Sequence, residues 1–244
     1  ESKDFFMRIE WELDNFTIPR EDLEERARAE IIRPLELQYQ LYFSASRPRM
    51  AVFVSRHAHC FADILHRFST GEWPVSIPLV ISNHEDLRNQ AENHGIPYFC
   101  LPVNRENKAE QEKRQLEMLA SHNVEFIVLG RYMQILSADF VAHYSNRIIN
   151  IHHSFLPAFP GSNPYRSAAE RGVKIIGATS HYVTPELDAG PIIEQGITRV
   201  SHRDTVDDMV RKGRDVERIV LAQAVYQHLN RKILVLNNRT VVFD

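Results

Sequence analysis

An amide, an imidazole and a carboxylate occur in this chain in the order Asn150, His152 and Asp188, with His181 between the last two. Asparagine and histidine side chains can donate hydrogen bonds to a carbonyl oxygen, or to the oxyanion that forms when the carbonyl is attacked. An aspartate can accept a proton and return it. The combination therefore predicts a site that attacks or transfers an acyl group.

The surrounding residues indicate how these groups are positioned. The apolar run 147–151 is typical of a short buried strand, and it ends in the polar cluster. A second predicted strand, 174–184, carries His181, and Asp188 follows on the loop 185–191. Because ligands of open α/β sheets bind at the carboxyl ends of strands, we expect these groups to meet at one sheet edge.

The same residues also have simpler interpretations. Asn150 and His152 alone could be a strand end with solvated side chains, but the joint occurrence with Asp188 favours chemistry. The side chains of His152, His153, His181 and Asp188 could bind zinc, yet the chain has no HExxH motif, and we predict no metal. His153 is expected to be structural, because adjacent strand residues face opposite sides.

Composition limits the function classes. The 244 residues allow one large domain, or one domain with a small attachment. A net charge of -3 excludes strong general attraction to nucleic acid or to an anionic membrane. The two cysteines form no CxxC motif, which favours a reducing cytoplasm. Cys60 is expected to be a buried helix-start residue rather than a reactive thiol, and Cys100 a core strand residue.

Hydrophobic periodicity predicts a small N-terminal part, residues 1–46, and a large α/β part, residues 47–244. In the small part, strands are predicted at 5–13 and 35–43, with a helix beginning after Pro19. Alternation of strands and helices in the large part predicts a mainly parallel sheet. Its strands are predicted at 50–55, 77–82, 97–101, 124–130, 147–151, 174–184 and 191–200. Its helices are predicted at 58–70, 84–94, 106–121, 137–144, 163–171 and 205–230, followed by a hairpin at 233–236 and 240–243.

Several motifs resemble the formyltetrahydrofolate-dependent formyltransferases, and within them the formyltetrahydrofolate deformylases. They are residues 131–137, 150–161, 181–183 and 187–195, with further similarity at 104–108 and 211–217. The resemblance implies a Rossmann-like formyltransferase fold and hydrolysis of 10-formyltetrahydrofolate to tetrahydrofolate and formate. It also implies an N-terminal ACT domain, a ligand-sensing α+β module. Residues 1–46 resemble only the second half of that module, so the domain is expected to be partial.

The resemblance also assigns roles to residues. Asn150 and His152 would hold the oxyanion, and Asp188 would activate the water, helped if burial raises its pKa. His181 would orient Asp188 or its water, and Ser154 would hydrogen-bond within the His152 loop. The pterin slot would be lined by the segment Arg131, Tyr132, Met133, Gln134, Ile135 and Leu136.

The turn after the first predicted strand of the large part bears on the acceptor. Formyltransferases of this fold that act on a phosphoribosyl amine carry glycines there, whose N–H groups cradle the phosphate. This chain has no glycine before Gly71. Arg56, His57 and His59 are expected to fill the acceptor site and to leave room only for water. A formyltransferase to an amine, and a folate or amino-acid sensor without catalysis, are the alternatives.

The expected partners follow from these assignments. The substrate is a reduced folate, and no tightly bound cofactor is predicted. A small amino-acid effector could bind the ACT-like part. The exposed sheet edges of a partial domain favour a homo-oligomer.

Overall fold

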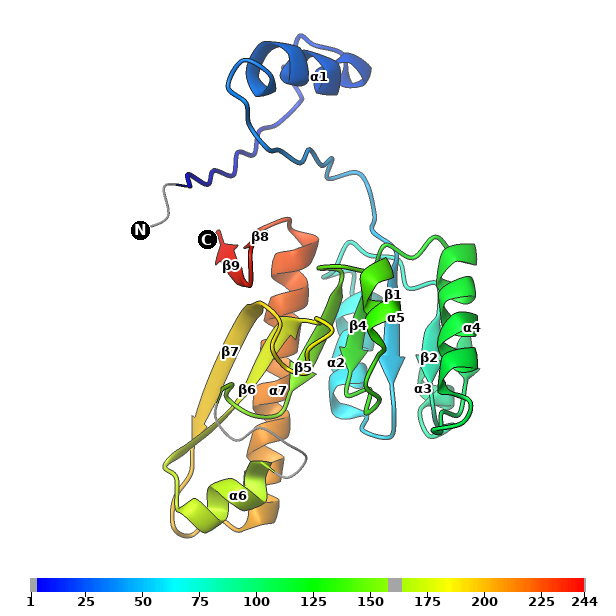
Figure 1. Cartoon of the computed structure of the whole chain (residues 1–244), viewed down its shortest axis with the longest axis vertical. Helices are drawn as coiled ribbons and strands as arrows, with labels where there is room; N and C mark the ends of the chain where they lie inside the picture. Colours follow the sequence, from blue (N-terminus) through cyan, green and yellow to red (C-terminus); the bar gives the residue numbers. More distant parts are fainter. Residues whose placement is uncertain (1–3, 158–163, 244) are drawn as a thin grey trace. The chain divides into compact units, whose positions relative to one another are not determined.

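The computed structural model describes residues 4–157 and 164–243. The chain divides into two compact units, residues 1–46 and 47–242 (Figure 1). The last residues of the Asn150 motif, 158–161, lie outside the described part of the chain. The larger unit carries all of the candidate site residues.

A seven-stranded sheet forms the centre of the larger unit, in the order β3-β2-β1-β4-β5-β6-β7. The first five strands are parallel, whereas β6 and β7 run antiparallel to their neighbours. The strand bounds are β1 Met50–Val54, β2 Val80–Ser82, β3 Tyr98–Cys100, β4 Phe126–Gly130, β5 Ile148–His152, β6 Ile175–Tyr182 and β7 Ile192–Arg199. Chain order reverses between β1 and β4, which is where open α/β sheets form ligand crevices.

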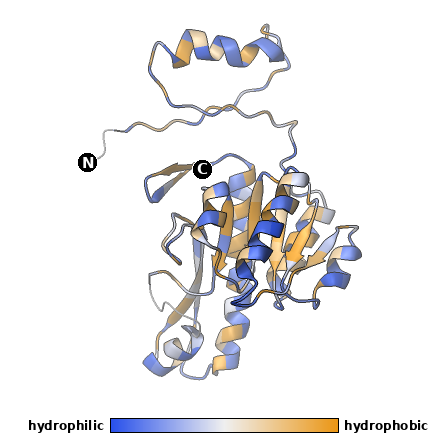
Figure 2. Ribbon diagram, turned by 45° about the vertical axis from the view of Figure 1, so that its right-hand side comes forward, coloured by the Kyte–Doolittle hydropathy of each residue, from blue (hydrophilic) through white to orange (hydrophobic). Residues whose placement is uncertain are grey.

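Helices cover both faces of this sheet (Figure 1). They are α2 His59–Ser69, α3 Arg88–Glu92, α4 Lys108–Ser121, α5 Ala138–His143, α6 Pro164–Arg171 and α7 Val206–Leu229, and a hairpin follows, β8 Ile233–Leu236 and β9 Arg239–Val242. Figure 2 shows the apolar residues concentrated in the central strands. Among the described residues, no helix has the length and apolar character needed to cross a membrane.

Two apolar clusters show which way the residues of β5 face. Ile149 and Ile151 pack in a cluster with residues of α2 and α7. Ile148 packs in the other cluster, with residues of α4 and α5. Because successive strand residues alternate between faces, Asn150 and His152 share the face of Ile148. The two faces of β5 therefore meet different sets of side chains.

The predicted α/β order is confirmed, with boundaries displaced by a few residues. The largest differences are β2, which is shorter than the predicted 77–82, and α3, which is shorter than the predicted 84–94. The predicted start of the last helix is also confirmed. Thr205 accepts a hydrogen bond from the Asp208 backbone N–H, and Asp208 caps Thr205 in return, which forms a capping box.

The smaller unit differs from the prediction. The predicted helix is present as α1 Arg20–Ala27, continued by the π-helical turn η1 Arg28–Ile32. The segments 5–13 and 35–43 form no strand, so both strand predictions are wrong. Alternating residues become a strand only where another backbone accepts the ladder of hydrogen bonds. Neither segment has such a neighbour among the described residues, and apolar side chains such as Phe5, at 84 % exposure, remain in solvent.

Candidate active site

The end of β5 and the adjoining β6 bring the predicted polar groups together. Asn150 is paired with His181 in the antiparallel register of these strands. The Asn150 Nδ2 atom lies 3.3 Å from His181 Nε2. Asp188 reaches both histidines, with its Oδ2 atom 3.3 Å from His152 Nδ1 and its Oδ1 atom 3.7 Å from His181 Nε2. The structure therefore joins all four residues in one cluster.

The backbone contact of His181 defines what its ring can do. Its Nδ1 atom lies 2.9 Å from the Tyr182 carbonyl oxygen, which can only accept, so Nδ1 carries a proton. Its Nε2 atom therefore faces both the Asn150 amide, at 3.3 Å, and Asp188 Oδ1, at 3.7 Å. His181 contacts the Asn150 amide as well as Asp188, and its predicted role of orienting Asp188 or its water stays a prediction.

The position of Asp188 depends on an unusual loop. Its backbone lies in the left-handed region, with φ of 55°, which aspartate tolerates better than most residues. Two residues later, a Cβ on Gly190 would collide with the Tyr182 carbonyl oxygen, so only glycine permits the loop to lie this close to β6. Gly190 thereby lets the loop bring Asp188 to the histidines.

The charge state of Asp188 differs from the expectation. Hydrogen bonds from His152 and then from His181 lower its pKa far below the usual range, although burial acts in the opposite direction. The condition that burial raises this pKa is therefore not met, because two imidazoles stabilise the carboxylate more than desolvation destabilises it. Asp188 is ionised at neutral pH.

His152 has one ring nitrogen available for a ligand. The residue is 6 % exposed, and its Nδ1 atom is directed at Asp188. Its Nε2 atom is buried and has no hydrogen-bond partner among the described residues. An unsatisfied buried nitrogen is costly, and it is common where a substrate atom completes the bonding.

A second set of contacts holds the loop that follows β5. The Thr179 hydroxyl donates to the Ser154 carbonyl at 2.9 Å and accepts from the Leu156 N–H at 3.0 Å. The Gln195 amide donates to this hydroxyl and to the Leu156 carbonyl, both at 3.0 Å. Ser154 was expected to bond within this loop, and its carbonyl is one of the anchored groups. These bonds fix the backbone directly after His152.

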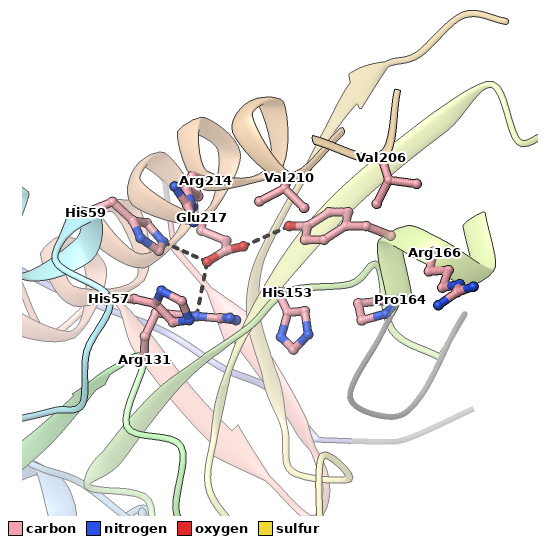
Figure 3. A pocket seen from close by; sticks show the side chains of 11 residues that line it. His57, His59, Arg131, His153, Pro164, Arg166, Val206, Val210, Arg214 and Glu217 are labelled. Atoms are coloured by element: carbon pink, nitrogen blue, oxygen red, sulfur yellow. Dashed lines mark hydrogen bonds and ion pairs between the residues drawn. The ribbon is translucent and has the colours of Figure 1, made fainter. Parts of the chain in front are cut away.

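A separate polar cluster lies at the other face of β5. Glu217 on α7 is 1 % exposed, and accepts from the Tyr165 hydroxyl and from His59 Nε2, both at 2.8 Å (Figure 3). Arg131 Nε is 3.5 Å from the same carboxylate. Burial raises the pKa of Glu217, but the His59 hydrogen bond and the charge of Arg131 outweigh it, so the pKa is lowered.

A glycine in the middle of α7 makes this cluster possible. A Cβ on Gly213 would overlap the Tyr165 hydroxyl and ring. Burial and the neighbouring Glu217 charge raise the pKa of Tyr165, so the hydroxyl remains a donor. Sequence reasoning missed Glu217 and Tyr165 as site residues. A glycine inside a helix, one turn before a glutamate, was the available signal.

Comparison with known proteins identifies the relatives of this arrangement. The family described as Formyl transferase matches residues 48–225. A formyltetrahydrofolate deformylase of Synechocystis is 55 % identical over 98 % of this chain and 84 % of its own length. That of Bacillus subtilis is 48 % identical over 98 % and 80 %. This chain belongs to the formyltetrahydrofolate deformylase family.

Solved structures agree with this membership. A deformylase from Pseudomonas syringae superposes with a TM-score of 0.88 and 48 % identity, over 91 % of this chain and 75 % of that one. A glycinamide ribonucleotide transformylase from Symbiobacterium toebii is more distant, with a TM-score of 0.77 and 29 % identity, over 84 % and 99 %. The predicted formyltransferase fold is thus confirmed.

The turn after β1 contains one buried serine and borders a cavity. Ser55 is buried, with its hydroxyl 2.6 Å from Asn83 Oδ1 and 3.0 Å from the Met133 N–H. Arg56 is exposed and is absent from the lining of the neighbouring cavity. His57 and His59 line this cavity of about 280 Å³ and leave it open. Glu217 holds His59 at one wall of the cavity, and the expectation that these three side chains fill the acceptor site stays a prediction.

The segment 131–136 divides between core and surface. Tyr132 and Leu136 are buried, whereas Met133 and Ile135 are more than half exposed and could face an aromatic ligand. Gln134 is half-buried. The side chain of Arg131 belongs to the Glu217 cluster (Figure 3). Of Arg131, therefore, only the backbone can contribute to the predicted pterin slot.

One group of potential metal ligands exists among the described residues, formed by His59, Cys60 and Glu217 within 4.8 Å. The guanidinium of Arg131 beside Glu217 opposes a second cation there. Burial and the Glu217 charge raise the pKa of Cys60, so its thiol keeps its proton and is a poor ligand. This group is better explained as a hydrogen-bonded cluster, and Cys60 is the buried helix-start residue that was predicted.

Proposed function

We propose that this deformylase hydrolyses 10-formyltetrahydrofolate to tetrahydrofolate and formate at the cluster of Asn150, His152 and Asp188. Family membership carries the reaction, at 55 % identity over nearly the whole chain. One observation carries the site: within the described part of the chain, His152 Nε2 is buried without a partner, next to an ionised Asp188. An acyl oxygen is the partner that this nitrogen lacks.

In the first step, a water oxygen attacks the formyl carbon, and the carbonyl oxygen becomes an oxyanion. Asn150 Nδ2 donates to this oxyanion, and His152, when both of its ring nitrogens carry protons, donates from Nε2 as a second, charge-assisted donor. A single such donor typically lowers the barrier by about 3 kcal/mol. The water's proton passes to Asp188, whose bonds to the two imidazoles weaken as its charge is lost.

In the second step, the bond between the formyl carbon and N10 breaks. The electron pair of that bond goes to N10, and Asp188 returns the proton to the same nitrogen. The products are tetrahydrofolate and formic acid, which loses its remaining proton to solvent and leaves as formate. Because Asp188 is ionised in the resting protein, it begins the cycle as a base and needs no prior deprotonation.

His181 has a positioning role in this scheme. Its Nδ1 proton is committed to the Tyr182 carbonyl, which fixes Nε2 beside the Asn150 amide and the Asp188 carboxylate. The ring would thereby hold both the oxyanion donor and the proton acceptor in place.

The folate would bind beside the segment 131–136, with Met133 and Ile135 against the pterin. The exposure of these two apolar side chains supports the assignment. No glycine cradle for a phosphate exists in the turn Ser55–His59, which supports water as the acceptor. A cytoplasmic location, in keeping with the free thiols of Cys60 and Cys100, belongs to the same proposal.

Residues 1–46 are proposed to be part of an ACT-like regulatory domain that binds an amino-acid effector and joins copies of the chain. Exposed apolar side chains in its two extended segments support association, including Ile9 at 61 % and Leu35 at 64 %. Sedimentation at micromolar concentration tests the oligomer, and a monomer would count against it.

The reaction is tested by measuring tetrahydrofolate and formate release from 10-formyltetrahydrofolate, with and without phosphoribosyl glycinamide. Formate release without the amine is the expected result. Turnover only with the amine would make the protein a transferase. Tight folate binding without turnover in either mixture would make it a sensor.

A further inference from the structure

The C-terminal hairpin β8–β9 lies at the end of the sheet where β6 ends and β7 begins, and β9 contacts β7 (Figure 1). From its turn, Asn238 Nδ2 donates to the Ala189 carbonyl at 2.7 Å, one residue after Asp188. The proposed reaction uses no residue of this hairpin. We propose that Asn238 is a positioning residue, which holds the loop of Asp188 beside the two histidines; this proposal rests on the proposed role of Asp188.

The hairpin is attached firmly enough to hold a loop. A two-stranded hairpin is marginally stable alone, so it needs packing against other elements. Ile233 and Val235 of β8 pack against the apolar cluster that contains residues of α7. Thr240 of β9 pairs directly with Val235 and shares its face, and the Thr240 hydroxyl donates to the Ile192 carbonyl at the start of β7. The core and the sheet edge therefore both fix the hairpin.

The turn of the hairpin does not explain why residue 238 is an asparagine. The positive φ of the turn, 54°, falls at Asn237, where asparagine tolerates the left-handed backbone better than most residues. The side chain of Asn238 instead reaches out of the hairpin to the Ala189 carbonyl. Within the described part of the chain, no backbone N–H donates to that carbonyl. The Asn238 amide thus supplies a bond that the loop's own backbone does not.

The other bonds of the loop 185–191 shape it from within or tie it to β6. The Thr184 hydroxyl donates to the Glu186 carbonyl at 3.0 Å, and the Ala189 N–H donates to the same carbonyl at 3.4 Å. The Tyr182 N–H donates to the Pro191 carbonyl at 3.0 Å. The bond from Asn238 differs because it links the loop to an element outside the β6–β7 connection.

The position of Asp188 leaves little tolerance. Its carboxylate oxygens lie 3.3 Å from His152 Nδ1 and 3.7 Å from His181 Nε2. Charge-assisted hydrogen bonds of this kind are roughly 2.7–2.9 Å long, so further separation would break both contacts. A misplacement of about 1 Å can cost about 100-fold in rate. The proposed folate contacts, at residues 131–136, lie outside this loop, so release of the loop should lower kcat and leave KM nearly unchanged.

Formate release from 10-formyltetrahydrofolate by the whole chain tests the proposal. Asn238→Ala should lower kcat by about 10- to 100-fold. Its KM should change by less than about twofold. Asn238→Asp keeps the size of the side chain but has no N–H to donate, so it should lower kcat similarly. Asn237→Gly is the matched control, because it lies in the same turn, and glycine accepts the positive φ there. The control should stay within about twofold of wild type.

A double-mutant comparison separates positioning from general damage to the fold. If Asn238 acts through Asp188, Asn238→Ala should change the residual single-turnover rate of Asp188→Asn by less than about twofold. An equal fold-loss in both backgrounds, or a higher KM with unchanged kcat, would overturn the proposal. Normal kcat in Asn238→Ala, together with lost turnover in Asp188→Asn, would overturn it and leave the proposed reaction standing. Near-normal turnover of Asp188→Asn would overturn both.

Discussion

Replacing Asp188 with asparagine removes the group that moves protons while it keeps the shape of the side chain. In the structure, the carboxylate contacts His152 at 3.3 Å and His181 at 3.7 Å. A positioned acid or base typically contributes about 10²–10⁴-fold to rate, which corresponds to about 3 to 5 kcal/mol of barrier. We expect kcat to fall within this range and KM for the folate to change little, because the lost interaction develops in the transition state.

The same substitution has a stability signature. The folded-state pKa of Asp188 is depressed, so its contribution to stability is fully present above the unfolded value near 4 and is lost as pH falls through the folded pKa. At pH 7, Asp188→Asn should lower the free energy of unfolding by about 1.5–3 kcal/mol, the worth of a charged hydrogen bond. The difference between wild type and variant should then shrink between about pH 4 and pH 2.

Single-turnover formate release and urea unfolding, measured on the same preparations, check both parts. Glu186→Gln is the matched control, since it removes an exposed carboxylate from the same loop. It should leave kcat and stability close to wild type. Asp188→Asn with near-normal turnover would refute the proton-transfer role. A stability difference that grows as pH falls below 4 would refute the assignment of the depressed pKa.

Three further outcomes are expected. His152→Ala should lower kcat far more than His153→Ala in steady-state assays, because His152 contacts Asp188 whereas His153 lines the cavity beside α6 and α7; the reverse ranking would contradict this assignment. Gly213→Ala should destabilise the chain by about 1–3 kcal/mol in urea unfolding, since the new Cβ displaces Tyr165 from Glu217; a more stable variant would mean that helix propensity dominates. Burial, and then the charge of Arg231, lowers the pKa of His228 to about 3, so stability should decline by about 1.4 kcal/mol per unit as pH falls from 6 to 4. His228→Gln should flatten that slope, and an unchanged slope would assign it to other groups.

The sequence predicted the α/β part well because its strands are buried on both faces. Runs such as Met50–Val54 and Phe126–Gly130 are apolar throughout, and glycines, prolines and polar turns separate them from amphipathic helices. The pairing of Asn150 with His181 was also foreseeable, since both follow from strand ends at one edge. The depressed pKa of Asp188 was not foreseeable, because it depends on contacts with two imidazoles, and a sequence pattern does not specify those distances.

The Glu217 cluster escaped prediction for a related reason. His59 and Glu217 are 158 positions apart, and they meet only because α2 and α7 pack on the same face of the sheet. The charged run 211–217 resembles the solvated face of a helix until the buried side of that helix is known. The strand predictions for residues 5–13 and 35–43 were wrong for the opposite reason. The alternation typical of a strand is present there, but no neighbouring backbone among the described residues pairs with it.

The two polar clusters also differ in how much of the chain each one needs. Asn150 and His181 are 31 positions apart and are joined by directly paired antiparallel strands. The cavity lined by His57, His59 and Glu217 joins residues from the turn after β1 to the middle of α7. Because loop closure over short separations is faster and costs less entropy, the catalytic cluster can assemble early during folding, from a local three-stranded unit. The cavity, by contrast, is complete only when the last long helix, α7, is packed on the sheet.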